Sequence, residues 1–286
     1  MYNSSIIPFT NNHSIEKCRY ISLVIDTEST EPNNKHYVAP GIIYEVGYRF
    51  TGYWRSKGKW HREKIAEVNR LVFETFQFAT PRKHRLYTSN SEQYEVTPFE
   101  KVWEEMYFTL ERLMRLGCST HIELSGFRID NDFDFMYRTQ DYIRKNFGTQ
   151  NKYIHPQELQ YTIPFKVPRG ITLDLRDLYS VYNTLTKKHI LFGHSNKLFK
   201  KSSFGKGVLT DFETLFKCFF MNMHYSQKHT AREDVIDEEN LLFDFLKTTQ
   251  RLPEMPKFGK TPKHFFDDQV SKYSINNNSV PSGVST

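Results

Sequence analysis

The sequence predicts an α/β domain built on a mixed β-sheet with flanking helices. Three strand-like segments come first, and strands that alternate with helices follow them. The chain has 286 residues, of which 38% are hydrophobic and 15% aromatic, so it can bury a sizeable core and is not a disordered chain. Its three cysteines, Cys18, Cys118 and Cys218, form no CxxC pair, and we expect neither a disulfide framework nor a zinc motif.

The strand-like segments near the N-terminus are recognised by apolar runs and by alternation. Residues 20–26 (YISLVID) form a short apolar run that ends in an acid, and residues 42–50 (IIYEVGYRF) alternate. Residues 71–78 (LVFETFQF) also alternate, so we expect a third strand there.

The clearest helical pattern begins near residue 99. Thr97-Pro98-Phe99-Glu100 has capping-box spacing with proline at the first helical position, and apolar residues follow at helical spacing until Gly117. The remaining pattern predicts strands at 121–127 and 171–175, and helices at 134–147, 176–188, 211–223 and about 230–249.

Charge and hydropathy indicate what the protein could bind and where it is found. With 39 Lys+Arg against 33 Asp+Glu, the formal charge is +6, which is compatible with nucleic-acid binding, although a solvated basic surface is the simpler explanation. No apolar run approaches the roughly 18 residues that a membrane span needs, and the first residues lack the pattern of a signal peptide. We expect an intracellular, cytoplasmic protein that does not bind membranes.

Asp26-Thr27-Glu28 is the first of three acidic motifs. Alternation along a strand sends both carboxylates to the same side, where they could hold a divalent ion. D-x-E also occurs at Asp211 and Asp237, and a solvated acid pair is the ordinary explanation for any one of them. The first differs because it ends a buried strand, where acids are costly unless they are used.

The second motif places three acids within five residues, at Asp130, Asp132 and Asp134. Their mutual repulsion would be relieved by a cation or by the N-terminus of the helix that follows. We expect at least one of them to do no more than cap that helix.

The third motif is H-x-A-x-x-D, from His229 to Asp234, and it is far rarer by chance than D-x-E. Five residues of continuous helix turn by about 500°, which would separate the two side chains. Both can therefore reach one site only if His229 lies in the turn before the helix.

In this order, the three motifs resemble the DEDDh family of 3′–5′ exonucleases, which includes DnaQ-type proofreading subunits, RNase T and oligoribonuclease. VIDTEST (24–30) resembles Exo I, DNDFDFM (130–136) Exo II and HTAREDV (229–235) Exo III, with YEVG (44–47) as the accompanying strand. The resemblance implies an RNase H-like fold over residues 20–250, with an N-terminal extension (1–19), a long insertion (about 49–97) and a basic C-terminal segment and tail (251–286).

The resemblance also implies the site and the chemistry. Asp26, Glu28, Asp134 and Asp234 would be the metal ligands, with Asp130 or Asp132 as alternatives to Asp134, and His229 would be the general base. Two Mg²⁺ or Mn²⁺ ions would assist hydrolysis of the phosphodiester bond. The general base must be neutral, so activity should fall when the imidazole becomes protonated at acid pH.

Single-stranded nucleic acid is the expected partner, and DNA is preferred to RNA as the substrate. Backbone contacts and base stacking could come from NKLFKKSSFGKG (196–207), which contains Lys197, Phe199, Lys200, Lys201, Phe204 and Lys206; a solvated loop is an equally good interpretation. The alternatives are an exoribonuclease and a non-catalytic nucleic-acid-binding or polymerase-associated module. The sequence does not indicate an oligomeric state.

Overall fold

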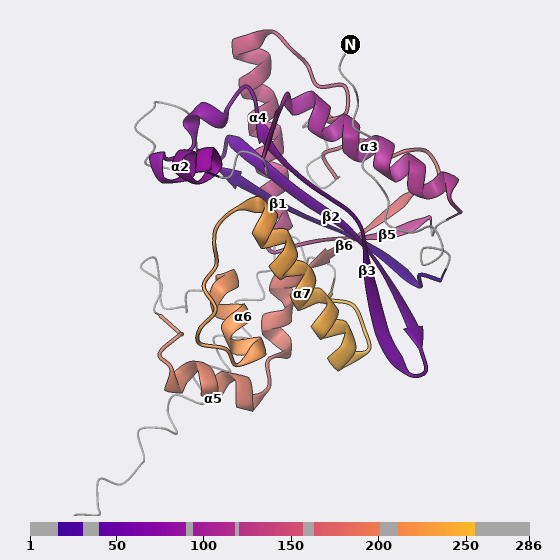
Figure 1. The fold of residues 1–286 in the computed structure, drawn as a ribbon, viewed down its shortest axis with the longest axis vertical. Coiled ribbons are helices and arrows are strands. Elements are labelled where there is room, and N and C mark those ends of the chain that lie inside the picture. Colours follow the sequence, from indigo (N-terminus) through magenta and orange to yellow (C-terminus); the bar gives the residue numbers. More distant parts are fainter. Residues whose placement is uncertain are drawn as a thin grey trace, which may run out of the picture. The chain divides into compact units, whose positions relative to one another are not determined.

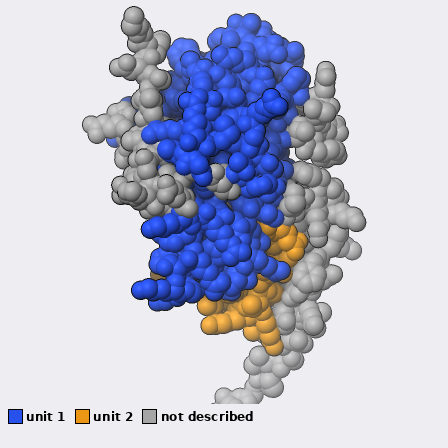
Figure 2. Space-filling view, turned by 90° about the vertical axis from the view of Figure 1, so that its right-hand side faces the viewer, with its two compact units in different colours: residues 1–176, 228–252 blue, residues 177–227, 253–286 orange. Residues whose placement is uncertain are grey.

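The structure is a computed structural model, in which the chain forms two compact units (Figure 2). Unit 1 comprises residues 1–176 and 228–252, and unit 2 comprises residues 177–227 and 253–286. The residues that the structure describes are 17–30, 40–89, 94–117, 120–156, 163–200 and 211–254. The limits of the domain at residues 20 and 250 stay a prediction.

Unit 1 is built on one six-stranded sheet with the order β4-β3-β2-β1-β5-β6 (Figure 1). In chain order the strands are β1 (Tyr20–Ser29), β2 (Ile43–Ser56), β3 (Lys59–Val72), β4 (Glu95–Thr97), β5 (His121–Gly126) and β6 (Thr172–Asp177). β2 runs antiparallel to β1 and β3, whereas β5 runs parallel to β1. A mixed sheet flanked by helices confirms the predicted α/β class, whereas the RNase H-like fold stays what the resemblance implies.

The third strand is not where the sequence predicts it. β2 and β3 form a long hairpin whose two-residue turn, Lys57-Gly58, has positive φ at both positions, as a type I′ turn requires. β3 ends at Val72, and a short 3-10 helix, η1 (Phe76–Phe78), follows. The Thr75 amide donates to the Val72 carbonyl over 3.1 Å in a turn, and its hydroxyl donates to the Ile43 carbonyl over 2.5 Å. The prediction of a strand over residues 71–78 is therefore wrong.

One face of the sheet is covered by α3 (Phe99–Arg115) and α4 (Ile129–Phe147). The apolar residues of this face come from alternate positions of the strands and meet one stripe of each helix. They include Ile21, Leu23 and Ile25 of β1, Val102, Trp103 and Met106 of α3, and Phe133 and Met136 of α4. This face holds the main hydrophobic core.

The start of α3 differs in detail from its prediction. Pro98 is the N-cap, and its hydrocarbon side chain cannot accept a capping hydrogen bond, while Thr97 is still paired in β4. The Phe99 amide donates instead to the Glu74 carboxylate over 3.0 Å. The helix is confirmed, but the capping box is not formed.

The other face of the sheet contacts α7 (Ala231–Thr249). Here the contacts include buried polar groups: the Tyr53 hydroxyl donates to Glu239 over 3.0 Å, and Arg62 pairs with the same carboxylate over 2.7 Å. α2 (Pro81–Ser89), which follows η1, belongs to the same unit. The helix predicted at about 230–249 is confirmed.

Unit 2 contains a 3-10 helix, η3 (Leu178–Thr184), and the helices α5 (Lys187–Ser195) and α6 (Phe212–Phe220). The helix predicted at 176–188 is thus a 3-10 segment, followed by a separate α-helix that begins at Lys187. Asp211 caps α6 by accepting from the Thr214 amide over 2.6 Å, and the Tyr182 hydroxyl donates to the Asp211 carbonyl over 2.6 Å. Within the described ranges, no helix is both long and apolar enough to cross a membrane.

Candidate metal site

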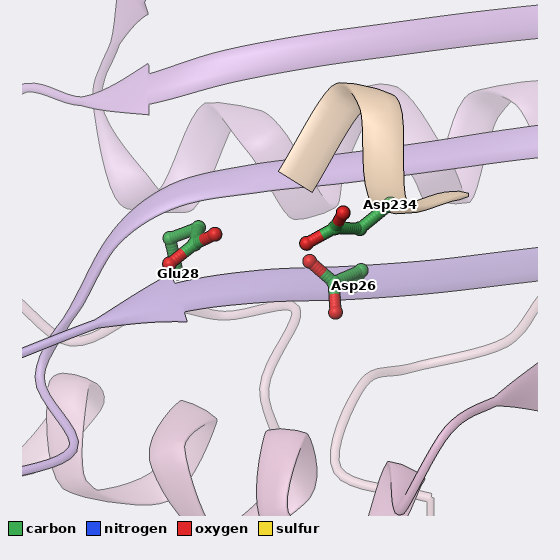
Figure 3. A group of neighbouring side chains, drawn as sticks. All are labelled: Asp26, Glu28 and Asp234. Atoms are coloured by element: carbon green, nitrogen blue, oxygen red, sulfur yellow. The ribbon is translucent and has the colours of Figure 1, made fainter. Parts of the chain in front are cut away.

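Three carboxylates meet at the face of the sheet that contacts α7. Asp26 and Glu28 belong to β1, and Asp234 lies in the first turn of α7. One oxygen of each lies within 4.8 Å of the others, and the three side chains point toward one another (Figure 3). Residues about 200 positions apart in the chain therefore form one acidic cluster.

The local structure explains how the cluster forms. Asp26 and Glu28 are two residues apart on one strand, so they share a face. The antiparallel partner of Asp26 is Gly47, and a Cβ atom on Gly47 would lie 2.4 Å from the Ala231 carbonyl oxygen. Only glycine lets the start of α7 approach β2 this closely, and that approach places Asp234 beside Asp26.

The second acidic motif lies inside α4 rather than in a turn before it, because α4 begins at Ile129. Two residues of helix turn by about 200°, so Asp132 and Asp134 point to opposite sides. Asp132 is buried and accepts from the Thr27 amide and hydroxyl over 3.1 and 2.5 Å. Asp134 pairs with Arg138 over 2.6 Å, and 43% of its side chain is exposed. The structure thus brings Asp132 to β1, whereas the resemblance implies Asp134.

Burial and mutual repulsion dominate the electrostatics of these carboxylates. Burial raises the pKa of Asp26 far above its usual range, and the charges of Asp234, Glu238 and Asp132 raise it further. Burial also raises the pKa of Asp132 to about 7, although the hydrogen bonds from Thr27 oppose this shift. The site therefore disfavours the ionised forms of its own carboxylates when no cation compensates them.

His229 occupies the position that the third motif requires. It precedes Thr230, the N-cap of α7, and it lies outside the helix with a φ of 56°. The Thr230 hydroxyl accepts from the Glu233 amide over 3.3 Å, which fixes the start of the helix. Burial raises the pKa of Glu28, and His229 is near enough that its charge opposes this shift. The motif therefore supplies both an exposed imidazole and a buried carboxylate to one region.

Sequence reasoning missed three further ionisable residues around the cluster. Glu238 lies one helical turn after Asp234 and accepts from the Phe127 amide over 3.2 Å. Glu45 is the cross-strand partner of Glu28, and Lys83 of α2 pairs with Glu28 over 3.0 Å. The i,i+4 spacing of Asp234 and Glu238 was visible in the sequence. Placing Glu45 and Lys83 requires the strand register and the position of α2.

Glu45 is fully buried and is bound by a tyrosine. The Tyr87 hydroxyl of α2 donates to it over 2.6 Å. Burial raises the pKa of Glu45 to about 7, while this hydrogen bond and the charge of Lys83 oppose the shift.

The basic segment proposed to bind the strand belongs to unit 2, where only part of it is described. Lys197 and Lys200 are exposed beyond α5, while Phe199 is half-buried and packs against Gly193 and His194. Lys201, Phe204 and Lys206 lie outside the described residues.

The donor set of the cluster fits a divalent cation. Carboxylate oxygens are the ligands that Mg²⁺ and Mn²⁺ prefer, and all three side chains of the cluster are carboxylates. A cation would also remove the repulsion that raises the pKa of Asp26.

No protein family matches the chain by its sequence profile, and no curated protein matches it by sequence. Among solved structures, the chain is similar to the crystal structure of cell-death related nuclease 4 (CRN-4), with 12% sequence identity and a TM-score of 0.43. This match covers 81% of the present chain and 66% of that chain, so the chain spans slightly less than two thirds of that protein.

Proposed function

We propose that the chain is a divalent-metal-dependent nuclease that removes nucleotides from the 3′ end of a nucleic-acid strand. The observation that carries the proposal is the convergence of Asp26, Glu28 and Asp234 within 4.8 Å. The position of His229 immediately before α7 adds a proton acceptor beside these carboxylates. Acidic ligands with an adjacent base are the groups that metal-assisted phosphodiester hydrolysis needs.

We assign Asp132, rather than Asp134, as the fourth ligand. The charge of Asp132 acts on Asp26, and its carboxylate is fixed by the Thr27 amide and hydroxyl. Asp134 is committed to its ion pair with Arg138. The four carboxylates would hold two Mg²⁺ or Mn²⁺ ions, which supply charge relief on the scissile phosphate and on the leaving oxygen.

The residues of the chain would then do the following. The four carboxylates would fix the positions of the two ions and, through them, the position of the scissile phosphate relative to the attacking water. His229 accepts a proton from that water, which requires the neutral imidazole and therefore gives an activity that rises from acid to neutral pH.

The role of His229 is tested by His229→Ala. We expect kcat to fall at least about 100-fold, because a general base contributes roughly this much, while Mn²⁺ binding stays unchanged. The measurement is a pH-rate profile together with an Mn²⁺ titration followed by electron paramagnetic resonance. Full activity in the variant would refute the role.

The substrate proposed is single-stranded DNA. The test is a time course on 3′- and 5′-labelled single-stranded DNA and RNA of matched sequence, with Mg²⁺, Mn²⁺ or EDTA, beside an Asp26→Ala control. Metal-dependent shortening from the 3′ end that disappears in the control would support the proposal, and faster loss of RNA would make the protein an exoribonuclease. Binding without cleavage under every metal would favour a non-catalytic nucleic-acid-binding module.

A further inference from the structure

Helix α2, between β3 and α3, places the ammonium group of Lys83 beside the acidic cluster. Lys83, in the first turn of α2, places its Nζ atom 3.0 Å from Glu28 Oε1. Only 13% of the Lys83 side chain is exposed. A lysine this well covered is unusual unless it is paired, because burial disfavours the ammonium ion.

The contact is part of a matched pair of interactions. Lys83 and Tyr87 are four residues apart and therefore lie on one face of α2. Lys83 meets Glu28 and Tyr87 meets Glu45, and these two glutamates are cross-strand partners in β1 and β2. One face of α2 thus contacts one cross-strand pair of the sheet, directly beside the cluster of Asp26, Glu28 and Asp234.

A change of partner at Glu28 indicates what the ammonium does when metal ions bind. This step rests on the proposed function. With a divalent ion bound, Glu28 has a metal ion as its partner and no longer needs the ammonium ion of Lys83. A substrate phosphate brings new negative charge beside Lys83, and an ammonium ion is a common phosphate ligand.

We propose that Lys83 is a substrate-binding residue that contacts a phosphate oxygen next to the metal site. Its ion pair with Glu28 then exists only until metal and substrate bind. Helix α2 would then add a phosphate contact to a site otherwise built from β1, α4 and α7.

For Lys83→Met, the proposal predicts tighter Mn²⁺ binding but a lower kcat/KM. Loss of a positive charge beside Glu28 makes the cluster more negative, so Mn²⁺ alone should bind at least about threefold more tightly. Loss of a phosphate contact should lower kcat/KM about tenfold or more at saturating Mn²⁺. Lys83→Arg keeps the charge and should restore most of both properties.

Two control variants separate this role from a structural one. Arg82→Met removes an exposed cation from the same helix and should leave both measurements unchanged. Tyr87→Phe removes the other docking contact of α2 and keeps the charge of Lys83.

The experiment is an Mn²⁺ titration by electron paramagnetic resonance and steady-state cleavage of a labelled oligonucleotide, for the full chain and each variant. Tighter Mn²⁺ binding with lower kcat/KM in Lys83→Met supports the proposal. Wild-type kcat/KM in that variant overturns it, and so does a parallel loss of both properties that Tyr87→Phe reproduces. A wild-type chain that cleaves nothing would instead refute the proposed function, and this inference with it.

Discussion

The two faces of the sheet in unit 1 are built from the same strands but carry different side chains, apolar on one face and acidic on part of the other. Toward α3 and α4, β1 presents Ile21, Leu23 and Ile25, all completely buried among apolar side chains. Toward α7, the same strand presents Asp26 and Glu28. The difference follows from strand alternation alone, since adjacent residues point to opposite faces.

The comparison shows that the main hydrophobic core and the acidic cluster lie on opposite faces of one sheet, although α7 also buries apolar side chains such as Leu242 and Leu246. The apolar face gains free energy from burial, at about 25 cal/mol per Å² of apolar surface. The acidic face loses free energy, because carboxylates are removed from water and placed near one another. We infer that the first face stabilises a fold in which the second can exist.

The largest expected effect concerns Asp132, which α4 brings to the acidic cluster from the other face of the sheet. Asp132→Asn should lower cleavage about 1,000-fold or more, because it removes a charge that the site needs for its metal ions. Asp134→Asn, two residues away on the opposite side of α4, should stay within about threefold of the wild type, since it loses only an exposed ion pair with Arg138. Cleavage rates at saturating Mn²⁺ compare the two variants. The reverse order of effects would restore Asp134 as the ligand.

The apolar face should respond in stability. Trp103 is 1% exposed and stacks on Phe165 with a ring-centroid distance of 5.5 Å, so Trp103→Ala should lower the free energy of unfolding by about 3–5 kcal/mol. Phe108→Ala, on the same helix but 51% exposed, is the matched control and should cost about 1 kcal/mol or less. Urea denaturation in EDTA measures both. Equal effects would mean that α3 does not cover the core as described.

A third prediction concerns how the free energy of unfolding depends on pH through the buried carboxyl group of Glu45. The pKa of Glu45 is about 7 in the folded chain and lower in the unfolded chain. The folded state therefore binds the proton more tightly, and its contribution to stability is full at acid pH and is lost as the pH rises through about 7.

Glu45→Gln carries no charge and can still accept from the Tyr87 hydroxyl. In EDTA, the wild type should lose up to about 3 kcal/mol between about pH 4.5 and 8 through this group, and the variant should lose that much less. Thermal unfolding across this pH range is the measurement, with the exposed Glu95→Gln as the control. Identical pH slopes for wild type and Glu45→Gln would show that Glu45 is not the source of the penalty.

Much of this architecture could be predicted because its signals are local. The apolar run before Asp26, the helical spacing from Phe99 and the H-x-A-x-x-D motif each depend on neighbours in sequence. β3 was missed because its hairpin turn places Lys57 at positive φ, a conformation that a lysine does not signal.

The rest of the site depends on contacts between distant elements. Asp132, which we propose as a ligand in place of Asp134, lies on the side of α4 that faces Thr27, and this depends on the packing of α4 on β1. Glu45 and Lys83 join the cluster through the register of β1 with β2 and the docking of α2. No periodicity in the sequence contains this information.

The central claim is that the acidic face is unfavourable by itself and becomes favourable with a divalent ion. The most direct test is the melting temperature of the wild type and of Asp26→Asn, in EDTA and in Mn²⁺. In EDTA the variant should melt a few degrees higher, because an amide neither repels the neighbouring carboxylates nor has to take up a proton on folding. Mn²⁺ should raise the melting temperature of the wild type and leave the variant nearly unchanged. A wild type that does not respond to Mn²⁺, or a variant that responds equally, would contradict the account.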